Sequence, residues 1–345
     1  MTAIDTAGRN LPPLPLLVTG ITGVHGFNAF RYLASRFPGS VYGVRPPQTF
    51  RLKGTGVVAL DADDANGLRD LCRDLGIRAI LNCAGNCALK SCELNPAMAR
   101  RLNVDSAHAI AGCVQEFNLK LVHVSSDLVF SGSSGVGGYV ESDPVDPVTV
   151  YGKTMVEAEH IIESLVPTAT ILRIALPMGP SFNRHAGAID WIDSRFRAGR
   201  PATLYFDEVR SVTYCDDLNR LFAELLALDL PGLFHCGGPK PITLFQIAQV
   251  VNRVGGYSPQ LLHGCPRRDA GPMPPRAGNC SMNSEKLISV LGFKPFRTWP
   301  ADPELWPSHD QWHVSRGRRE SGGMHRIRAE LHHAAESIAC LANDP

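Results

Sequence analysis

The first half of the chain alternates short apolar runs with longer segments in which apolar residues recur at helical spacing. The longer segments predict helices at Val24–Phe37, Ala65–Leu75, Pro96–Phe117 and Val150–Leu165. The apolar runs predict buried strands at Leu14–Gly20, Ser40–Val44, Val57–Leu60, Ala79–Asn82, Lys120–Ser125 and Ala169–Ile174. Continuous apolar strands separated by helices are typical of a parallel sheet covered on both faces. We therefore expect a Rossmann-type doubly wound α/β domain over residues 14–175, to which later parts of the chain return.

The pattern changes after residue 175, where Gly and Pro become frequent. Helical spacing at 189–198, 216–227 and 244–254 predicts a small C-terminal substrate lobe over residues 176–298. Residues 299–345 form a Pro- and charge-rich tail. Its amphipathic end, His325–Leu341, predicts a docked terminal helix or an oligomer contact. Residues 1–13 lack a basic segment followed by an apolar core, so we expect a disordered leader and not a signal peptide.

Composition narrows the class of protein. The 345 residues are 44% hydrophobic and 19% charged, which suits a soluble globular chain. The formal net charge of +1 gives no electrostatic case for nucleic acid or for a membrane surface. No apolar stretch is long enough to predict a membrane span. The ten cysteines occur without an export signal, and we expect reduced thiols in a cytoplasmic protein.

A glycine-rich turn follows the first predicted strand. Gly20, Gly23 and Gly26 are spaced G-x-x-G-x-x-G between this strand and the first predicted helix. The first glycine permits the tight turn, the second lets the backbone approach a pyrophosphate, and the third lets helix and strand pack closely. The N–H groups of the helix N-terminus attract the phosphates. The turn predicts a dinucleotide site formed by Gly20, Thr22, Gly23, Val24, His25 and Gly26.

The end of the second predicted strand bears on the choice of dinucleotide. An acidic residue at this position would hold the ribose hydroxyls of NAD, whereas an arginine accommodates the 2′-phosphate of NADP. Arg45 stands there without an acidic neighbour. We therefore expect NADP, with NAD as the alternative. A solvated surface arginine explains the same residue without a ligand.

Four further segments follow the glycine turn in order: Asn82-Cys-Ala-Gly85, Leu102-Asn-Val-Asp105, Val124-Ser-Ser-Asp-Leu-Val-Phe130 and Val150-Tyr-Gly-Lys-Thr-Met155. Together with the turn they resemble the extended short-chain dehydrogenase/reductase family, in its dTDP-4-dehydrorhamnose reductase branch. The regulatory β subunit of methionine adenosyltransferase also belongs to that branch. The resemblance runs from about residue 15 to about residue 295. It implies cofactor contacts by Asp61, Ala62, Cys83, Ala84, Gly85, Asn103 and Tyr151. A helix cap at Asp63 or Asp64 explains the acidic stretch equally well.

The resemblance also implies the catalytic groups. In such enzymes a tyrosine protonates the alkoxide that develops as hydride arrives, and a serine hydroxyl holds the substrate carbonyl. By motif, Tyr151 is the acid and Ser126 the hydroxyl, with Ser125 as a weaker candidate. A lysine one helical turn after the tyrosine normally bonds the nicotinamide ribose and lowers the pKa of the tyrosine.

Two positions depart from this pattern. Met155 occupies the lysine position, and Lys153 cannot replace it, because two residues turn a helix by about 200°. Without a nearby ammonium we expect the phenol to keep a pKa near its ordinary value of about 10. Leu128 stands where rhamnose-pathway reductases usually carry a tyrosine, which puts the usual sugar in doubt. Either a positive group from elsewhere replaces the lysine, or the chain binds NADP without efficient hydride transfer.

Substrate contacts are assigned by position within the family pattern. The candidates are Asp127, Leu128, Lys90, Asn183, Arg184 and Arg210. Arginines there would suit the phosphates of a nucleotide diphosphate, and solvated surface residues are the alternative. We expect Glu157 and Glu159 to form a solvated helix face, and His123 to be a buried structural residue. We expect no metal, since neither Cys83, Cys87 and Cys92 nor His309 and His313 provide a usual ligand set.

These observations predict an NADP-dependent reductase of a keto group on a nucleotide-activated sugar or a similar polar carbonyl compound. One alternative is a non-catalytic NAD(P)-binding protein that regulates or docks on a partner. Another is a sugar-nucleotide epimerase or dehydratase, because the same scaffold supports those reactions. We expect a small-molecule substrate and a possible homodimer, with no nucleic acid or membrane partner.

Overall fold

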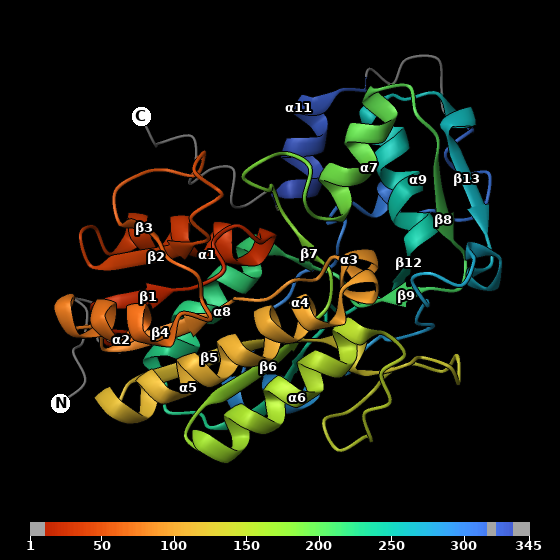
Figure 1. Cartoon of the computed structure of the whole chain (residues 1–345). Helices are drawn as coiled ribbons and strands as arrows, with labels where there is room; N and C mark the ends of the chain where they lie inside the picture. The colour runs from red at the N-terminus through yellow and green to blue at the C-terminus, as the bar shows by residue number, and fades with distance from the viewer. Residues whose placement is uncertain (1–10, 316–321, 334–345) are drawn as a thin grey trace.

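The computed structural model describes residues 11–315 and 322–333, so most of the expected leader lies outside it. A seven-stranded sheet forms its centre in the order β11-β6-β5-β4-β1-β2-β3. All of its neighbouring strands pair in parallel. Helices cover both faces of the sheet (Figure 1). The predicted doubly wound α/β fold is confirmed.

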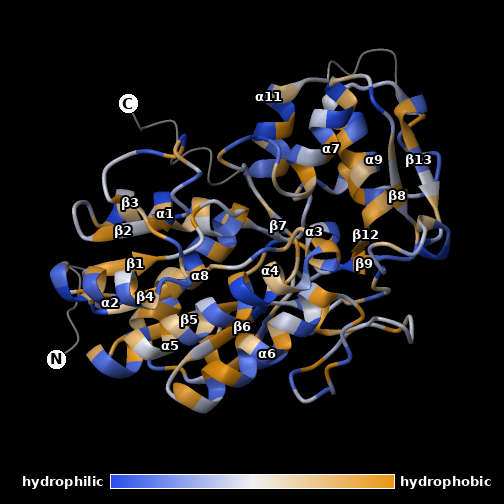
Figure 2. Cartoon of the chain, viewed as in Figure 1, coloured by the Kyte–Doolittle hydropathy of each residue, from blue (hydrophilic) through white to orange (hydrophobic). Residues whose placement is uncertain are grey.

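The strands of the sheet are short and apolar. They are β1 (Leu16–Val18), β2 (Val41–Arg45), β3 (Val57–Ala59), β4 (Ala79–Asn82), β5 (Lys120–Ser126), β6 (Thr170–Ile174) and β11 (Gly232–Cys236). Every residue of β1, β4 and β6 is buried, because helices cover both faces of the sheet, and most of these residues are apolar. Figure 2 shows hydrophobic residues on these strands and on the helices around them. Six of the strands were predicted, and β11 is the strand that returns from later in the chain.

Two helical layers enclose the sheet. One contains α2 (Ala65–Asp74), α5 (Ser106–Phe117) and α6 (Val150–Leu165). The other contains α1 (Val24–Arg36), α8 (Cys215–Ala227) and α10 (Glu285–Leu291). The predicted helix Pro96–Phe117 is divided into α4 (Pro96–Arg100), a π-helical segment (Arg101–Asp105) and α5, and it is preceded by α3 (Leu89–Leu94).

The placement of α8 corrects the sequence analysis, which assigned residues 216–227 to the lobe. Leu218, Phe222 and Leu225 of α8 are buried in the same core as Leu16 of β1. These positions repeat every three to four residues and form one apolar helix face. The sheet provides the apolar surface on which that face is buried.

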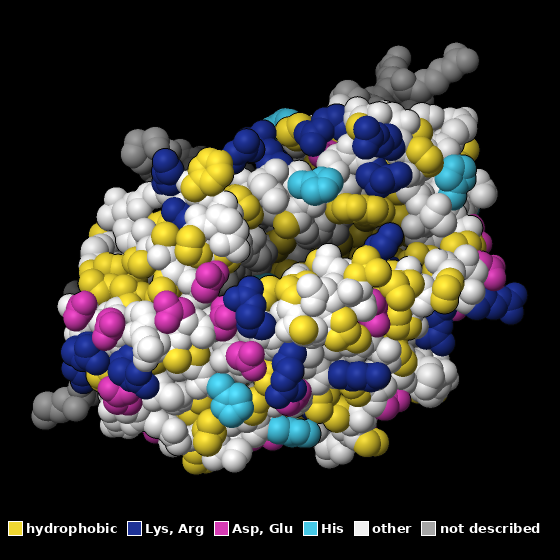
Figure 3. Space-filling view, viewed as in Figure 1, with side chains coloured by type: hydrophobic (Ala, Val, Ile, Leu, Met, Phe, Trp, Pro, Cys, Tyr) yellow, Lys and Arg dark blue, Asp and Glu magenta, His cyan; other side chains and the backbone are white. Residues whose placement is uncertain are grey.

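The smaller lobe has its own core. It contains the helices α7 (Ala188–Arg197) and α9 (Leu244–Gly255). Its short strands are β7 (Pro177–Met178), β8 (Ala202–Tyr205), β9 (Val209–Arg210), β10 (Thr213–Tyr214), β12 (Ile242–Thr243) and β13 (Leu262–Cys265). Figure 3 shows a hollow between this lobe and the sheet domain.

The start of the expected tail belongs to the lobe core. Trp299, Trp312, Ile327 and Leu331 are buried against α7 and α9. The terminal segment begins as α11 (Met324–Arg326) and a π-helical turn (Ile327–His332). The rest of the expected helix, residues 334–341, lies outside the described residues. Within the described ranges, none of the helices has the length and apolar character that a membrane crossing requires.

Candidate active site

The glycine turn connects β1 to α1, as the spacing predicted. Gly20 has a φ of +64°, and a Cβ there would lie 2.1 Å from the carbonyl oxygen of Cys83. A Cβ at Gly26 would lie 2.3 Å from the carbonyl oxygen of Gly20. Both distances are far below van der Waals contact, so these two positions accept no side chain. A Cβ at Gly23 would meet nothing closer than 3.5 Å.

The N-terminus of α1 is not capped by a side chain. Gly23 is its N-cap residue, and the first turn contains no acidic residue. The first N–H groups of a helix have no partner within it, and the helix dipole makes this end attractive to an anion. Burial lowers the pKa of His25 to about 4, against a smaller opposing effect of its hydrogen bond with the Cys83 backbone. Its imidazole is therefore neutral at neutral pH.

Thr19 ties the ends of two central strands together, a role that the sequence analysis missed. Its hydroxyl donates to Oδ1 of Asn82 at 2.6 Å and accepts from the backbone N–H of Cys83 at 3.1 Å. Thr19 is fully buried. A polar residue at the end of an otherwise apolar strand was the signal that could have identified it, because a buried hydroxyl needs a partner.

The loop after β4 is fixed by Asn103 of the π-helical segment. Oδ1 of Asn103 accepts from the backbone N–H of Asn86 at 2.6 Å, and its Nδ2 donates to Thr154 Oγ1 of α6 at 2.8 Å. A Cβ at Gly85 would lie 3.1 Å from the same Oδ1. Along this loop Cys83 is buried, Ala84 is half-buried and Gly85 is exposed. Asn103 thus shapes the loop that the family pattern assigns to the cofactor.

Arg45 lies at the end of β2, but its guanidinium folds back on the following loop. Nε donates to the carbonyl of Leu52 at 2.7 Å, and Nη1 donates to the carbonyls of Pro46 and Pro47 at 3.1 Å each. Nη2 has no hydrogen bond among the described residues. Arg45 therefore orders the loop 46–52, and its outer nitrogen Nη2 takes no part in that contact.

The residues of the acidic stretch before α2 have different roles. Asp64 caps α2 by accepting from the backbone N–H of Gly67 at 3.0 Å, the alternative that local sequence suggested. Asp63 pairs with Arg101 at 2.7 Å. Asp61 and Ala62 are half-buried between β3 and that cap.

Ser126 and Tyr151 meet where β5 ends and α6 begins. The Oγ of Ser126 accepts from the backbone N–H of Leu128 at 3.2 Å, which orients the hydroxyl. Thr149 caps α6 by accepting from the N–H of Gly152 at 2.9 Å. A Cβ at Gly152 would lie 2.2 Å from the carbonyl oxygen of Leu128, so glycine lets α6 start directly against the end of β5.

The phenol of Tyr151 is buried, and burial is the main cause that raises its pKa above the ordinary value. A hydrogen bond with Ser126 and the charge of Arg210 act in the opposite direction, and that of Asp127 adds to the increase. The pKa near its ordinary value that the sequence analysis expected is therefore corrected upward. Tyr151 is fully protonated at neutral pH and can donate a proton.

Ser125 lies on the opposite side of β5, because successive side chains of a strand alternate. Its hydroxyl donates to Oε1 of Glu159 at 2.5 Å. Glu159 forms a buried, two-pronged ion pair with Arg173, at 2.9 Å from Nε and 2.7 Å from Nη2. The weaker catalytic candidate therefore belongs to a core network. The expected solvated face is wrong for Glu159, whereas Glu157 is partly exposed and pairs with Arg100.

Met155 is buried one turn after Tyr151. Its neighbours in this cluster include Cys92, Ala99 and Leu128, all of them apolar or weakly polar. Lys153 is exposed, as the helix geometry predicted. The position to which the resemblance assigns the lysine is therefore an apolar packing position.

Two predicted substrate residues, Asp127 and Arg210, pair with each other. Nε of Arg210 donates to Oδ2 of Asp127 at 2.5 Å, and Nη2 donates to Oδ1. Asp127 is 0% exposed and Arg210 is 5% exposed. Glu208 lies 3.7 Å from Nη1 of Arg210 and 3.0 Å from Nε of Arg276. These charged side chains, of which only Arg276 is partly exposed, join the end of β5 to the lobe.

The chain is similar to known proteins in sequence and in fold. A family model described as the RmlD substrate binding domain matches residues 15–304. The chain belongs to this family. The family and the fold that the motifs predicted are thus confirmed.

Two curated proteins and one solved structure are examples of the proteins to which this RmlD-type chain is similar. The probable low-salt glycan biosynthesis reductase Agl14 of Haloferax volcanii is 25% identical over 59% of this chain and 68% of its own. Methionine adenosyltransferase 2 subunit beta of Bos taurus is 24% identical over 86% of this chain and 89% of its own. The dTDP-4-dehydrorhamnose reductase of Bacillus anthracis, solved in complex with NADP, has a TM-score of 0.72 at 19% identity, over 82% of this chain and 95% of its own.

The other predicted substrate residues of this RmlD-type chain take no part in the Asp127–Arg210 ion pair. Lys90 is exposed on α3, and Leu128 is buried beside Tyr151. Oδ1 of Asn183 accepts from two backbone N–H groups of its own turn, each at 3.0 Å. Arg184 has a φ of +54° and lines a separate cavity. Within the described ranges, no group of three or more His, Cys, Asp or Glu residues could hold a metal ion.

Proposed function

We propose that the chain is an NADP-dependent reductase of a keto group on a nucleotide-activated sugar or a similar polar carbonyl compound. The observation that carries this proposal is the meeting of Ser126 and Tyr151 at the carboxyl edge of the sheet that also bears the glycine turn. Ligands of open α/β sheets bind at that edge. The NADP complex of the Bacillus anthracis relative supports the choice of cofactor.

The residues at the turn fit a dinucleotide. An uncapped helix N-terminus without acidic residues suits a pyrophosphate, and Gly20 and Gly26 keep strand and helix close enough to form the site. Arg45 would bind the 2′-phosphate through its outer nitrogen. Asp61 and Ala62 would contact the adenine side, and the loop 83–85 would line the nicotinamide side. The cofactor, when bound, supplies the hydride.

The chain's own groups supply the acid. Ser126 would donate a hydrogen bond to the carbonyl oxygen of the substrate, and Tyr151 would donate its phenolic proton to the same oxygen as negative charge develops there. Burial raises the pKa of the Tyr151 phenol; since Met155 provides no charge, the positive group that opposes this rise is Arg210. Arg210 remains paired with Asp127, so its effect on the phenol is weaker than that of a free ammonium.

Oxidation of NADPH in the presence of a panel of dTDP- and UDP-linked 4-keto sugars tests the proposal. We expect turnover with at least one compound and a loss of about 100-fold or more in Tyr151→Phe. Tyr42→Phe, on β2, is the matched control and should keep the native rate. Equal rates for the native chain and Tyr151→Phe would overturn the mechanism.

A second candidate is a reductase-like protein that binds NADP and acts through a partner. The apolar burial of Met155 favours it, and so does the long match to methionine adenosyltransferase 2 subunit beta. This candidate predicts NADP binding with negligible turnover on every keto sugar of the panel. Met155→Lys should then create or sharply raise turnover, while Met155→Leu, which keeps the apolar packing, should not. Unchanged turnover in Met155→Lys would count against it.

A further inference from the structure

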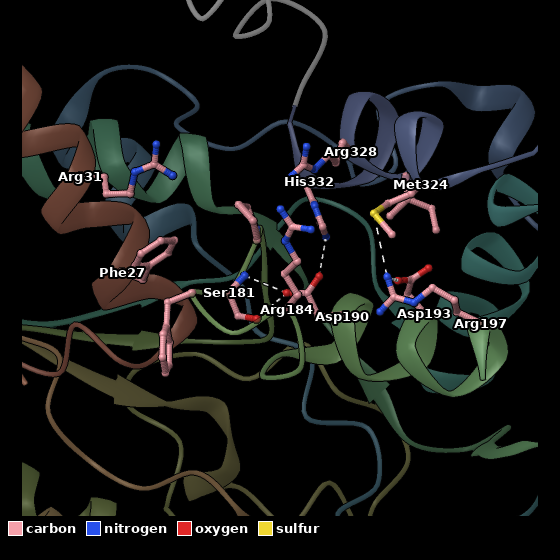
Figure 4. A pocket seen from close by; sticks show the side chains of 13 residues that line it. Phe27, Arg31, Ser181, Arg184, Asp190, Asp193, Arg197, Met324, Arg328 and His332 are labelled. Carbon is pink, nitrogen blue, oxygen red and sulfur yellow. Dashed lines mark hydrogen bonds and ion pairs between the residues drawn. The ribbon is translucent and has the colours of Figure 1, made fainter. Parts of the chain in front are cut away.

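A cavity lies apart from Ser126, Tyr151 and the glycine turn. It has a volume of about 200 Å³ and lies between α1, the loop after β7, α7 and the C-terminal segment. Figure 4 shows these elements facing one another across it. Neither the three glycines of the turn nor the two catalytic candidates line it. The cavity is therefore not part of the dinucleotide site described above.

Arginines from four parts of the chain line this cavity: Arg31, Arg184, Arg197 and Arg328. Within the described part of the chain, Arg184 and Arg328 have no ion-pair partner. The guanidinium of Arg31 lies over the ring of Phe27, 5.5 Å from its centroid. Nη1 of Arg197 is 3.6 Å from Oδ2 of Asp193, which is a loose ion pair. Figure 3 shows a gathering of Lys and Arg side chains over α7 and α11.

The two acids of the cavity are already engaged. Asp190 accepts from the backbone N–H of Ser181 at 2.8 Å and from its hydroxyl at 2.5 Å. Burial raises the pKa of Asp190, but hydrogen bonds from His332 and Ser181 outweigh it and hold the pKa below its ordinary value. Asp193 accepts from the hydroxyl of Tyr257 at 2.5 Å. The carboxylates therefore leave the arginines in excess.

His332 adds a buried polar atom without a partner. Its Nε2 lies 3.1 Å from Oδ1 of Asp190, and the residue is 5% exposed. The dashed line between His332 and Asp190 in Figure 4 marks this contact. Its Nδ1 has no hydrogen-bond partner among the described residues. A buried ring nitrogen without a partner is unfavourable unless a ligand or water satisfies it. Since His332 lines the cavity, a ligand there would supply that partner.

We propose that this cavity binds a phosphate group, either free or carried by a small phosphomonoester. The planar guanidinium groups match phosphate oxygens in two-pronged hydrogen bonds, and the excess of positive charge favours a dianion. The cavity would hold the volume of about six or seven water molecules at ~30 Å³ each, which suits such a group. Arg328 and His332 lie beyond the family match, which ends at residue 304, so the site depends on this chain's own C-terminal segment.

Calorimetric titration of the full chain with inorganic phosphate, at constant ionic strength and with saturating NADP⁺, tests the proposal. We expect saturable binding that Arg328→Gln weakens by about tenfold. Arg326→Gln is the matched control. It removes the same charge from the same segment, but its guanidinium pairs with Glu330 at 2.7 Å, so phosphate affinity should stay within about twofold. A thermal melt of each variant checks that the segment still packs.

Three results would overturn the proposal: no binding of phosphate, displacement of phosphate by NADP⁺, or the same loss of affinity in Arg326→Gln as in Arg328→Gln. An equal loss of affinity in both variants would mean that only the net charge of the segment, and not the position of Arg328, affects phosphate binding. A parallel titration with glucose 1-phosphate distinguishes the source of the phosphate group. Tighter binding of the ester identifies a phosphomonoester, and tighter binding of the inorganic ion identifies free phosphate.

Discussion

The guanidinium of Arg210 donates to both carboxylate oxygens of Asp127, with Nε 2.5 Å from Oδ2. Arg210 comes from β9 of the lobe, whereas Asp127 directly follows Ser126 at the end of β5. The pair therefore joins the lobe to the sheet beside the hydroxyl that we propose to hold the substrate. Two-pronged pairs of this kind fix direction as well as distance.

Arg210→Met should destabilise the chain strongly. It leaves Asp127 buried without its partner, and breaking a buried pair on one side costs about 3–5 kcal/mol of unfolding free energy. Urea denaturation measures the change. Arg220→Met is the control, because Arg220 is about half exposed and its partner Asp217 keeps Arg297 at 2.7 Å. Similar losses for both variants would mean that the Asp127–Arg210 pair has no special role.

Glu159→Gln and Glu157→Gln make the same change on the same helix. The first removes the charge that pairs with buried Arg173 and should cost roughly 3 kcal/mol or more. The second breaks an exposed pair with Arg100 and should cost less than about 1 kcal/mol. Chemical denaturation of the two variants gives the comparison. A cost for Glu157→Gln as large as that for Glu159→Gln would contradict the assignment of Glu159 to the core.

Gly26→Ala should weaken both the fold and dinucleotide binding. Its Cβ would lie 2.3 Å from the carbonyl oxygen of Gly20, so α1 would have to move away from the turn. Gly112→Ala on α5 is the control, since a Cβ there meets nothing within 4 Å, and alanine should add up to about 1 kcal/mol of stability. Thermal melts with and without NADP⁺ report both effects. Full NADP⁺ binding by Gly26→Ala would contradict the proposed role of the turn.

His123 should make the fold sensitive to mild acid. Burial lowers its pKa to about 4, against a smaller opposing effect of Glu159, while the unfolded chain has the ordinary value of 6.5. The unfolding free energy that the neutral His123 side chain contributes is complete above pH 6.5. It is lost as the pH falls from 6.5 toward 4, because only the unfolded chain takes up the proton. Between pH 7 and pH 5, His123→Phe should lose about 2 kcal/mol less unfolding free energy than the native chain. His160 is exposed, so the unfolding free energy of His160→Gln should depend on pH as that of the native chain does. An equally weakened pH dependence in His160→Gln would contradict the role given to His123.

Most of the fold could be predicted because its signals are local. Apolar runs and helical spacing gave six strands of the sheet and the full extent of α6, since a covered parallel sheet requires continuous apolar strands. The partner of an apolar helix face is not local. The sequence of α8 predicts an apolar face. It does not tell whether the sheet or the lobe covers that face, and in the structure the sheet covers it. The burial of Trp299 and Trp312 in the lobe core was missed for the same reason.

The candidate site could be predicted as a set of positions but not as a set of pairings. The glycine turn, Ser126 and Tyr151 follow from motifs with fixed spacing. The motif also gave Asp127 and Arg210 as substrate contacts, although they pair with each other across 83 residues of sequence. Ser125 and Ser126 are adjacent hydroxyls, and only the alternation of β5 separates the core network from the site. Long-range pairing of charges leaves no local pattern in the sequence.

Transfer of deuterium from NADPH labelled at C4 of the nicotinamide tests the central claim most directly. We predict that the native chain reduces a nucleotide-linked 4-keto sugar to an alcohol that carries the deuterium on its new carbinol carbon, and that Tyr151→Phe, still able to bind NADPH, forms about 100-fold less of it. A native chain that binds NADPH tightly and leaves every keto sugar unlabelled, or a Tyr151→Phe variant that labels the product at the native rate, would contradict the account.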